Sequence, residues 1–461
     1  MSSTNKKANR ELLAPHSHEL EFGGVFGALF VTVSVPLTMY YLTFGCNADM
    51  GCSAWLPLSN ASGFWSYAKK QFLDSFQDPV AWGLYYSWYL YCVVAWYVIP
   101  GDWVQGLPLR TGEKLSYKIN ALKTGALALG IALAIIAIKG PASFTLLYDH
   151  FPGLLSAAFV NSIVQAIYVY VGSFRGDKLL ALGGNSGNVL FDWFIGRELN
   201  PRIGSFDIKT FNELRPGLLL WVLIDISCAC HQWTTFGRLS DSMALVTLFH
   251  AWYTIDSLIH ESTIFSQMDI TTDGFGFMLS VGDLAWLPFT YCLQARYLAF
   301  HPVDLGLLGI LAVLAVQFVG YYIFRTANVE KNEFRHGRNP KRLDFMTTSS
   351  GRKLLTSGWW GRSRHPNYFG DWIMAWAWCL PCGFSTPIPY FYVIYFAVLL
   401  WHRQLRDDDA CRKKYGNEYV QKMRSVTSML TSVSHKCTSS FSQLRRIAGT
   451  FTYVCCVTFM N

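Results

Sequence analysis

The sequence contains little charge for its length. Only 15% of the 461 residues are Asp, Glu, Lys or Arg, whereas 52% are hydrophobic and 16% aromatic. Long stretches lack these four charged residues altogether, namely 22–48, 79–101, 151–174, 305–324 and 372–402. Because roughly 20 apolar residues cross a bilayer as a helix, this composition excludes an ordinary soluble protein and predicts a polytopic membrane protein.

Shorter apolar segments fill the gaps, at about 124–138, 216–232, 243–260 and 274–294. The stretch 372–402 is too long for one ordinary span and too short for two full ones. Its middle contains Pro381, Gly383, Pro387 and Pro389, which interrupt a helix. A single broken span is one interpretation, but we favour a hairpin of two short helices. The expected fold is an all-α membrane bundle of about ten transmembrane helices that ends in this hairpin.

The chain also lacks a secreted disulfide framework and internal repeats. Many of the twelve cysteines lie within apolar stretches, among them Cys92, Cys228, Cys230, Cys292, Cys379 and Cys382. The CLPC sequence that contains the last two resembles a redox motif, yet packing is the favoured interpretation. The first apolar stretch is far longer than the core of a cleavable signal peptide, so we expect it to act as a signal anchor.

The distribution of Lys and Arg predicts the orientation, because such residues accumulate on the cytosolic side. If the N-terminus is cytosolic, the basic loops 102–123, 175–215 and 325–371 share that side. The loop 49–78 is then lumenal, which suits the glycosylation sequon at Asn60. We expect a short cytosolic segment at 1–21, a membrane domain at 22–424 and a Ser/Thr-rich, weakly ordered tail at 425–461.

Two segments that flank the predicted hairpin combine cations with aromatic rings. They read WWGRSRHPNYFGDW, residues 359–372, and HRQLRDDDACRKKYG, residues 402–416. In a hairpin they become neighbours at the membrane surface, where they would suit a planar, polyanionic nucleotide. The alternative is that the basic residues reflect only the positive-inside bias or attraction to anionic lipid.

Ionisable residues within the apolar segments indicate a second site, because charge is costly in hydrocarbon. His250, Tyr253 and Asp256 are spaced three residues apart in FHAWYTIDSLIHE, so on a helix Tyr253 lies within side-chain reach of both neighbours. The pattern is compatible with proton donation by Tyr253 with help from a neighbouring His or acid. A hydrogen-bonded structural cluster between helices is an equally good interpretation.

Two longer sequences resemble the signature regions of the integral membrane sterol reductases, GNVLFDWFIGRELNPR at 187–202 and HRQLRDDDACRKKYG at 402–416. The similarity runs from about residue 100 to 422. The stretches RHPNYFGDWIMAWAWCLPCG and DGFGFMLSVGDLAWLPFTYCLQARYL most resemble the C-14 (Δ14) sterol reductases of that family. Residues after about 424 look unrelated to it.

The resemblance implies a ten-helix protein of the endoplasmic reticulum membrane that takes a sterol from the bilayer. It would use NADPH, bound on the cytosolic side, to reduce the 14,15 double bond. Tyr253 would be the proton donor, with His250 and Asp256 as its catalytic neighbours. The implied cofactor contacts are Lys331, Arg335, Leu355, Trp360, Asn367, Tyr368, Arg403, Asp407, Cys411 and Tyr415. We expect membrane lipid around the protein, no nucleic-acid partner and no metal.

Three alternatives remain at this stage. A Δ7 or C-24(28) sterol reductase shares the same family features, since the choice of bond depends on the shape of the pocket. A membrane methyltransferase that uses S-adenosylmethionine is suggested by the RHPNY sequence, although the number of preceding spans argues against it. A non-catalytic sterol-binding scaffold is the third.

Overall fold

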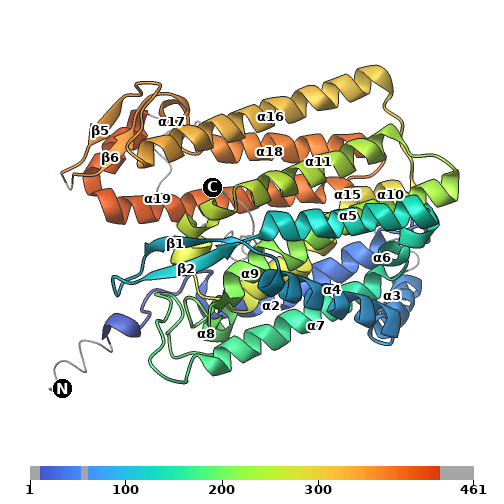
Figure 1. Ribbon diagram of the computed structural model, residues 1–461, viewed down its shortest axis with the longest axis horizontal. Helices are drawn as coiled ribbons and strands as arrows, with labels where there is room; N and C mark the ends of the chain where they lie inside the picture. Colours follow the sequence, from blue (N-terminus) through green and yellow to red (C-terminus); the bar gives the residue numbers. More distant parts are fainter. Residues whose placement is uncertain (1–10, 53–60, 350, 426–461) are drawn as a thin grey trace.

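The structure, a computed structural model, describes residues 11–52, 61–349 and 351–425. It is mostly helical, and the long helices lie side by side along the longest axis of the molecule (Figure 1). The sequon at Asn60 and the tail at 426–461 lie outside the described residues.

The long helices are α2 (Gly24–Gly45), α3 (Ala61–Phe76), α4 (Pro79–Val98), α5 (Ala121–Lys139), α7 (Phe151–Gly172), α10 (Pro216–Phe236), α11 (Asp241–Ile259), α16 (Gly306–Arg335), α18 (Pro366–Cys379) and α19 (Phe391–Ser425). Shorter helices are α6 (Leu146–Asp149), α8 (Val189–Ile195), α9 (Ile208–Leu214), α12 (Met268–Thr271), α13 (Phe277–Val281), α14 (Leu287–Thr290), α15 (Leu293–Phe300) and α17 (Trp359–Arg362). Single turns of 3-10 helix occur at Pro141–Phe144, Glu261–Ser266, Leu380–Cys382 and Ile388–Tyr390, and a π-helical turn occurs at Gly282–Trp286.

The strands are short and pair as three antiparallel hairpins. They are β1 (Asp102–Pro108) with β2 (Lys114–Ile119), β3 (Arg202–Ile203) with β4 (Phe206–Asp207), and β5 (Phe345–Thr347) with β6 (Lys353–Leu355). In β1 and β2, Asp102 lies opposite Ile119 and Gln105 opposite Ser116. All three hairpins lie in loops between helices, so the fold remains a helix bundle.

Five helical segments of the described residues are long and apolar enough to cross a membrane. They are α2, α5, α7, the combined segment Ile208–Phe236 and α16. These segments fit a multi-pass membrane protein, but they are fewer than the expected ten or so. Helices α4 and α11 occupy two further expected positions, at 79–101 and 243–260, but they are not among these five segments.

The segment 274–294 differs from the single span expected there, because it is divided into α13, a π-helical turn and α14. Backbone atoms of this segment lie very close to the backbone at Gly196 and Gly217. A Cβ atom on Gly276 would lie 2.3 Å from the backbone nitrogen of Gly196, and one on Gly217 would lie 1.7 Å from the carbonyl oxygen of Asp283. Every residue of the segment is buried, so it lies inside the bundle.

The basic connections gather at one end of the bundle. The β1–β2 hairpin, α8, the β5–β6 hairpin and α17 lie at that end, together with the start of the described chain, whereas α3 and α6 lie at the other (Figure 1). We call the first the basic end. This arrangement agrees with the alternation of loops that the Lys and Arg distribution predicted.

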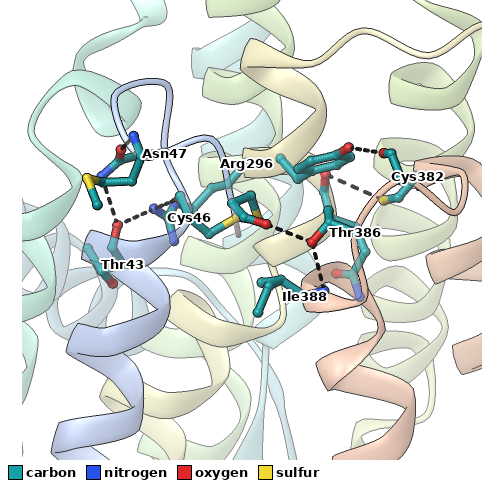
Figure 2. Close-up of a disulfide and its surroundings, with 12 residues drawn as sticks. Thr43, Cys46, Asn47, Arg296, Cys382, Thr386 and Ile388 are labelled. Carbon is teal, nitrogen blue, oxygen red and sulfur yellow. Dashed lines mark hydrogen bonds between the residues drawn. A yellow bond between two sulfur atoms is a disulfide. The ribbon is translucent and has the colours of Figure 1, made fainter. Parts of the chain in front are cut away.

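At the opposite end, Cys46 and Cys52 form a disulfide in the loop that follows α2. The Arg296 guanidinium of α15 donates hydrogen bonds to the Thr43 and Cys46 carbonyl oxygens, at 3.2 Å each. The Thr386 hydroxyl, between α18 and α19, donates to the Cys52 carbonyl oxygen at 2.7 Å (Figure 2). The sequence analysis missed this pair, although both cysteines lie near the end of an apolar stretch and only six residues apart.

The two CLPC cysteines are buried and unbridged, as the packing interpretation expects. The Gln294 side-chain amide of α15 donates to the Cys379 sulfur at 3.2 Å, and the thiol donates to the Pro389 carbonyl oxygen at 3.4 Å. These contacts hold the turn between α18 and α19 against the bundle.

Helices α16 and α18 touch along their backbones at two glycines. A Cβ atom on Gly370 would lie 2.5 Å from the Phe324 backbone nitrogen and 2.7 Å from the Gly320 carbonyl oxygen. A Cβ atom on Gly320 would lie 2.8 Å from the Gly370 carbonyl oxygen. Small residues allow membrane helices to approach in this way, so this contact sets the separation of α16 and α18.

We therefore predict that Gly370→Ala lowers the free energy of unfolding by about 1–3 kcal/mol, because the new methyl group overlaps main-chain atoms that cannot rotate away. Thermal unfolding in detergent measures the effect. Gly130→Ala in α5 is the matched control, since nothing lies within 4 Å of its Cβ position. That control is expected to be neutral or to stabilise by up to about 1 kcal/mol through helix propensity. Equal stability of both variants would contradict the importance of the glycine contact.

Candidate active site

The two sequences predicted to become neighbours meet at the basic end of α18 and α19. These helices are antiparallel, and the chain between them is broken at residues 380–390, where Pro381 and Pro389 lie (Figure 1). The Tyr368 hydroxyl donates a hydrogen bond to the Asp407 carboxylate at 2.6 Å. Arg364 forms an ion pair with Asp408 at 3.0 Å. The helical hairpin therefore brings residues of 359–372 and 402–416 together in one cluster, which we call the charged rim.

The centre of this rim is a stack of His365 on Tyr368, with ring centroids 4.7 Å apart and planes 8° apart. Burial lowers the pKa of His365 to about 4, although Asp407 opposes that shift from 3.8 Å. Burial also acts to raise the pKa of Asp407, but His365, Arg403 and the Tyr368 hydrogen bond together hold it below its usual value. At neutral pH the rim therefore holds a neutral imidazole beside a carboxylate.

Helix α16 supplies the next wall of the site. The Lys331 ammonium lies 4.5 Å from the centre of the Trp360 ring, a cation–π distance. The Trp360 indole N–H donates to the Ala327 carbonyl oxygen at 2.9 Å, which ties α17 to α16. Leu355 is buried at the end of β6. Lys331, Trp360 and Leu355, three of the predicted cofactor residues, therefore come from α16, α17 and β6.

Arg335 ends α16 and lines a cavity of about 350 Å³. The other lining residues are Phe334, Gly337, Asn339, Phe345 and Lys353. Two cations and two aromatic rings therefore face the same hollow at the outer edge of the rim. Tyr415, further along α19, has the Arg352 guanidinium 6.0 Å from its ring centre, and Cys411 is partly exposed.

Arg403 lies deeper than the other predicted cofactor residues. Its guanidinium donates to the buried Asp269 carboxylate at 3.1 Å, and it also interacts with Tyr368. Arg406 pairs in the same way with Asp273 at 2.9 Å. The sequence analysis did not assign these two acids, which hold α19 against residues 269–274 (DITTDG).

The three residues predicted for proton transfer lie near one another, but two of them are paired with other helices. The His250 ring lies 4.6 Å from the Trp221 ring and 5.0 Å from the Trp378 ring, the same two rings that Tyr253 contacts. The His250 ring Nδ1 lies 2.8 Å from the Asp225 carboxylate of α10, and both side chains are fully buried. The Asp256 carboxylate is paired with Arg325 and accepts a hydrogen bond from the Tyr321 hydroxyl at 3.1 Å. His250 and Asp256 therefore have partners of their own on other helices.

Tyr253 is buried in a cluster of aromatic rings inside the bundle, which we call the aromatic cluster. Its ring centre is 5.1 Å from that of Trp378 on α18 and 6.3 Å from that of Trp221 on α10. Its hydroxyl faces the carboxyl group of Asp371, one helical turn beyond Asn367 and Tyr368. Sequence reasoning missed Asp371 because the neighbour of Tyr253 comes from another helix rather than from its own.

Comparison with known proteins is consistent with this architecture. Residues 16–432 match the ergosterol biosynthesis ERG4/ERG24 family. The Delta(14)-sterol reductase of Schizosaccharomyces pombe is 53% identical over 413 residues, which cover 88% of this chain and 95% of that protein. The Saccharomyces cerevisiae Delta(14)-sterol reductase is 42% identical over 90% of this chain and 97% of its own. The Delta(14)-sterol reductase LBR of Gallus gallus is 43% identical over 86% of this chain and 61% of its own.

The helical bundle with a charged, aromatic rim therefore belongs to a family of sterol-modifying membrane proteins. The chain is a member of the ERG4/ERG24 family, and the resemblance to sterol reductases inferred from its motifs is confirmed.

We predict that Tyr368→Phe destabilises the protein by about 1–3 kcal/mol, because the partly buried Asp407 carboxylate loses a hydrogen bond. Thermal unfolding in detergent measures the loss. The control is Tyr390→Phe, whose buried hydroxyl has no hydrogen-bond partner among residues 11–52, 61–349 and 351–425. Removing that hydroxyl is expected to leave stability unchanged. A Tyr368→Phe variant as stable as the control would contradict the role assigned to this hydrogen bond.

Proposed function

We propose that the protein reduces the C14=C15 double bond of a Δ8,14 sterol intermediate in sterol biosynthesis, with NADPH as the hydride source. The observation that carries the proposal is the double role of α18. Asn367 and Tyr368 at its start belong to the charged rim, whereas Trp378 near its end packs on Tyr253. One rigid helix thereby links a nucleotide-type site to a proton donor.

The residues of the rim fit a dinucleotide phosphate in charge and shape. Lys331, Arg335 and Lys353 supply cations for phosphate groups, and the rings of Trp360 and Phe345 supply flat surfaces. When bound, NADPH supplies a hydride. The chain would orient it through Asn367, Tyr368, Arg403, Asp407, Cys411 and Tyr415, with Leu355 as an apolar contact.

The aromatic cluster around Tyr253 is compatible with protonation of the alkene. Reduction of an unactivated alkene requires a proton on one carbon and leaves a tertiary cation on the other until the hydride arrives. Tyr253 holds a proton on its hydroxyl oxygen, and the Trp221 and Trp378 rings exclude water around it. Their faces also favour a cation. A flat, apolar sterol would reach Tyr253 from the surrounding lipid.

The proposed location is the endoplasmic reticulum membrane, with the rim facing the cytosol. Two observations support this orientation. The basic connections lie at the rim end, as cytosolic loops do. The Cys46–Cys52 disulfide lies at the opposite end, and disulfides persist in oxidising compartments such as the lumen.

The direct test is turnover of a Δ8,14-diene sterol by the purified protein, followed by mass spectrometry. We expect NADPH-dependent addition of two hydrogens at C14 and C15. The Tyr253→Phe variant should lose activity by about 10²- to 10⁴-fold, because the proton donor is gone, while NADPH binding is retained.

The outcomes separate the alternatives. Reduction of a Δ7 or C-24(28) sterol instead would change the assigned bond within the family. Turnover with S-adenosylmethionine and none with NADPH would overturn the reductase assignment. Binding of sterol without NADPH binding would favour a scaffold. Wild-type turnover by Tyr253→Phe would exclude Tyr253 as the donor.

A second prediction concerns Arg335, which we expect to contact the 2′-phosphate that distinguishes NADPH from NADH. Arg335→Ala should weaken NADPH binding by roughly 10- to 100-fold, the effect of losing a charge-assisted hydrogen bond, and leave NADH binding nearly unchanged. Titration calorimetry with each nucleotide measures both. The control is Arg338→Ala, whose guanidinium is exposed and pairs with Glu333. Equal weakening of both nucleotides would refute the 2′-phosphate contact.

A further inference from the structure

Asp371 is a fully buried acid whose position is not explained by packing. Its relative exposure is 0%, and neither carboxylate oxygen has a partner in regular hydrogen-bond geometry among the residues that the structure describes. The group that it faces is the Tyr253 hydroxyl.

Several other buried acids of the bundle have basic partners, although Asp192, Glu213 and Asp283 form no ion pair within the described part of the chain. Asp225 lies beside His250, Asp256 beside Arg325, Glu261 beside Arg215 and Asp269 beside Arg403. None of the ion pairs in the described part of the chain includes Asp371. Burying a polar group without a partner destabilises the fold, and burying an isolated charge destabilises it more. An acid in this position is therefore expected to be stored in its neutral form.

The position of Asp371 is tightly determined on both sides. The preceding residue, Gly370, lies against the α16 backbone, where no side chain fits. The following residue, Trp372, donates its indole N–H to the Val393 carbonyl oxygen of α19 at 3.1 Å. One turn earlier, Tyr368 is bonded to Asp407. Contacts on α16 and α19 therefore hold the acid beside Tyr253.

We propose that Asp371 is the proton reserve of Tyr253, an inference that rests on the proposed reductase function. The Tyr253 O–H bond breaks and its proton forms the new C–H bond on the alkene, while the Asp371 carboxylic acid gives its own proton to the phenolic oxygen. Tyr253 stays neutral throughout. The negative charge remains on Asp371, where it balances the positive charge that hydride loss leaves on the oxidised nicotinamide. Water returns one proton to Asp371 after the product leaves.

This relay has a chemical advantage over an isolated tyrosine. An unperturbed phenol has a pKa of about 10, so forming its anion among apolar side chains is energetically unfavourable. If the phenolic oxygen is reprotonated in the same step, the charge appears on a carboxylate. Asp371 acts through Tyr253 and need not touch the sterol, so we assign it as a positioning and proton-supplying residue.

The first test uses the isosteric variant Asp371→Asn in the full-length protein. We expect turnover of the Δ8,14-diene to fall by about 10²-fold or more, with NADPH binding unchanged. Combined with Tyr253→Phe, it should cost no more than the worse single change, because residues that act as a unit are not additive. The control is Asp304→Asn, an exposed acid paired with Arg238 at the opposite end of the bundle.

Two results would overturn the proposal. One is wild-type turnover by Asp371→Asn, and the other is a loss that multiplies with that of Tyr253→Phe. An inactive wild-type protein would instead refute the proposed function itself, which separates the two failures.

A measurement on the unmodified protein keeps the proposal testable if Asp371→Asn does not fold. The rate of the reductive step is followed under single-turnover conditions in mixtures of H₂O and D₂O. Two protons moving together give a rate that curves with deuterium content, whereas a single proton gives a straight line. A curved dependence is expected. A straight line would exclude simultaneous transfer from Asp371.

Discussion

The backbone contact between α16 and α18 at Gly320 and Gly370 is the constraint on which the site depends. It places Lys331 of α16 close enough to His365, at the start of α18, and to Asp407 of α19 for their charges to interact. The same contact directs the next turn of α18 toward Tyr253. With a wider helix separation, the cofactor rim and the proton donor would no longer be connected by one rigid element.

Charge is distributed in two different ways along the bundle. Near the basic end, the ion pairs of Arg403 with Asp269 and Arg406 with Asp273 fasten α19 to residues 269–274. In the aromatic cluster, Asp371 has no cation and faces a phenol. Paired charges give a site its shape, whereas an unpaired acid in an apolar setting is available for chemistry.

The end of the bundle opposite the charged rim is held together by hydrogen bonds around a disulfide loop. The loop closed by the Cys46–Cys52 disulfide is tied to α15 by Arg296 and to the α18–α19 turn by Thr386 (Figure 2). The short hairpin is therefore anchored at its turn as well as at its charged rim. Such anchoring at both ends keeps Tyr368 and Trp378 in fixed relation along α18.

The sequence by itself determined the helical membrane class, the side on which the basic loops gather, the hairpin break and the family, because apolar length, Lys and Arg distribution and proline placement are local properties. It also identified most residues of the rim, which lie close together along the chain. Only the tertiary structure decided that His250 and Asp256 pair with Asp225 and Arg325, that the segment 274–294 is broken, and that Asp371 faces Tyr253. These contacts join different helices, and spacing along one helix carries no information about which neighbour will face it.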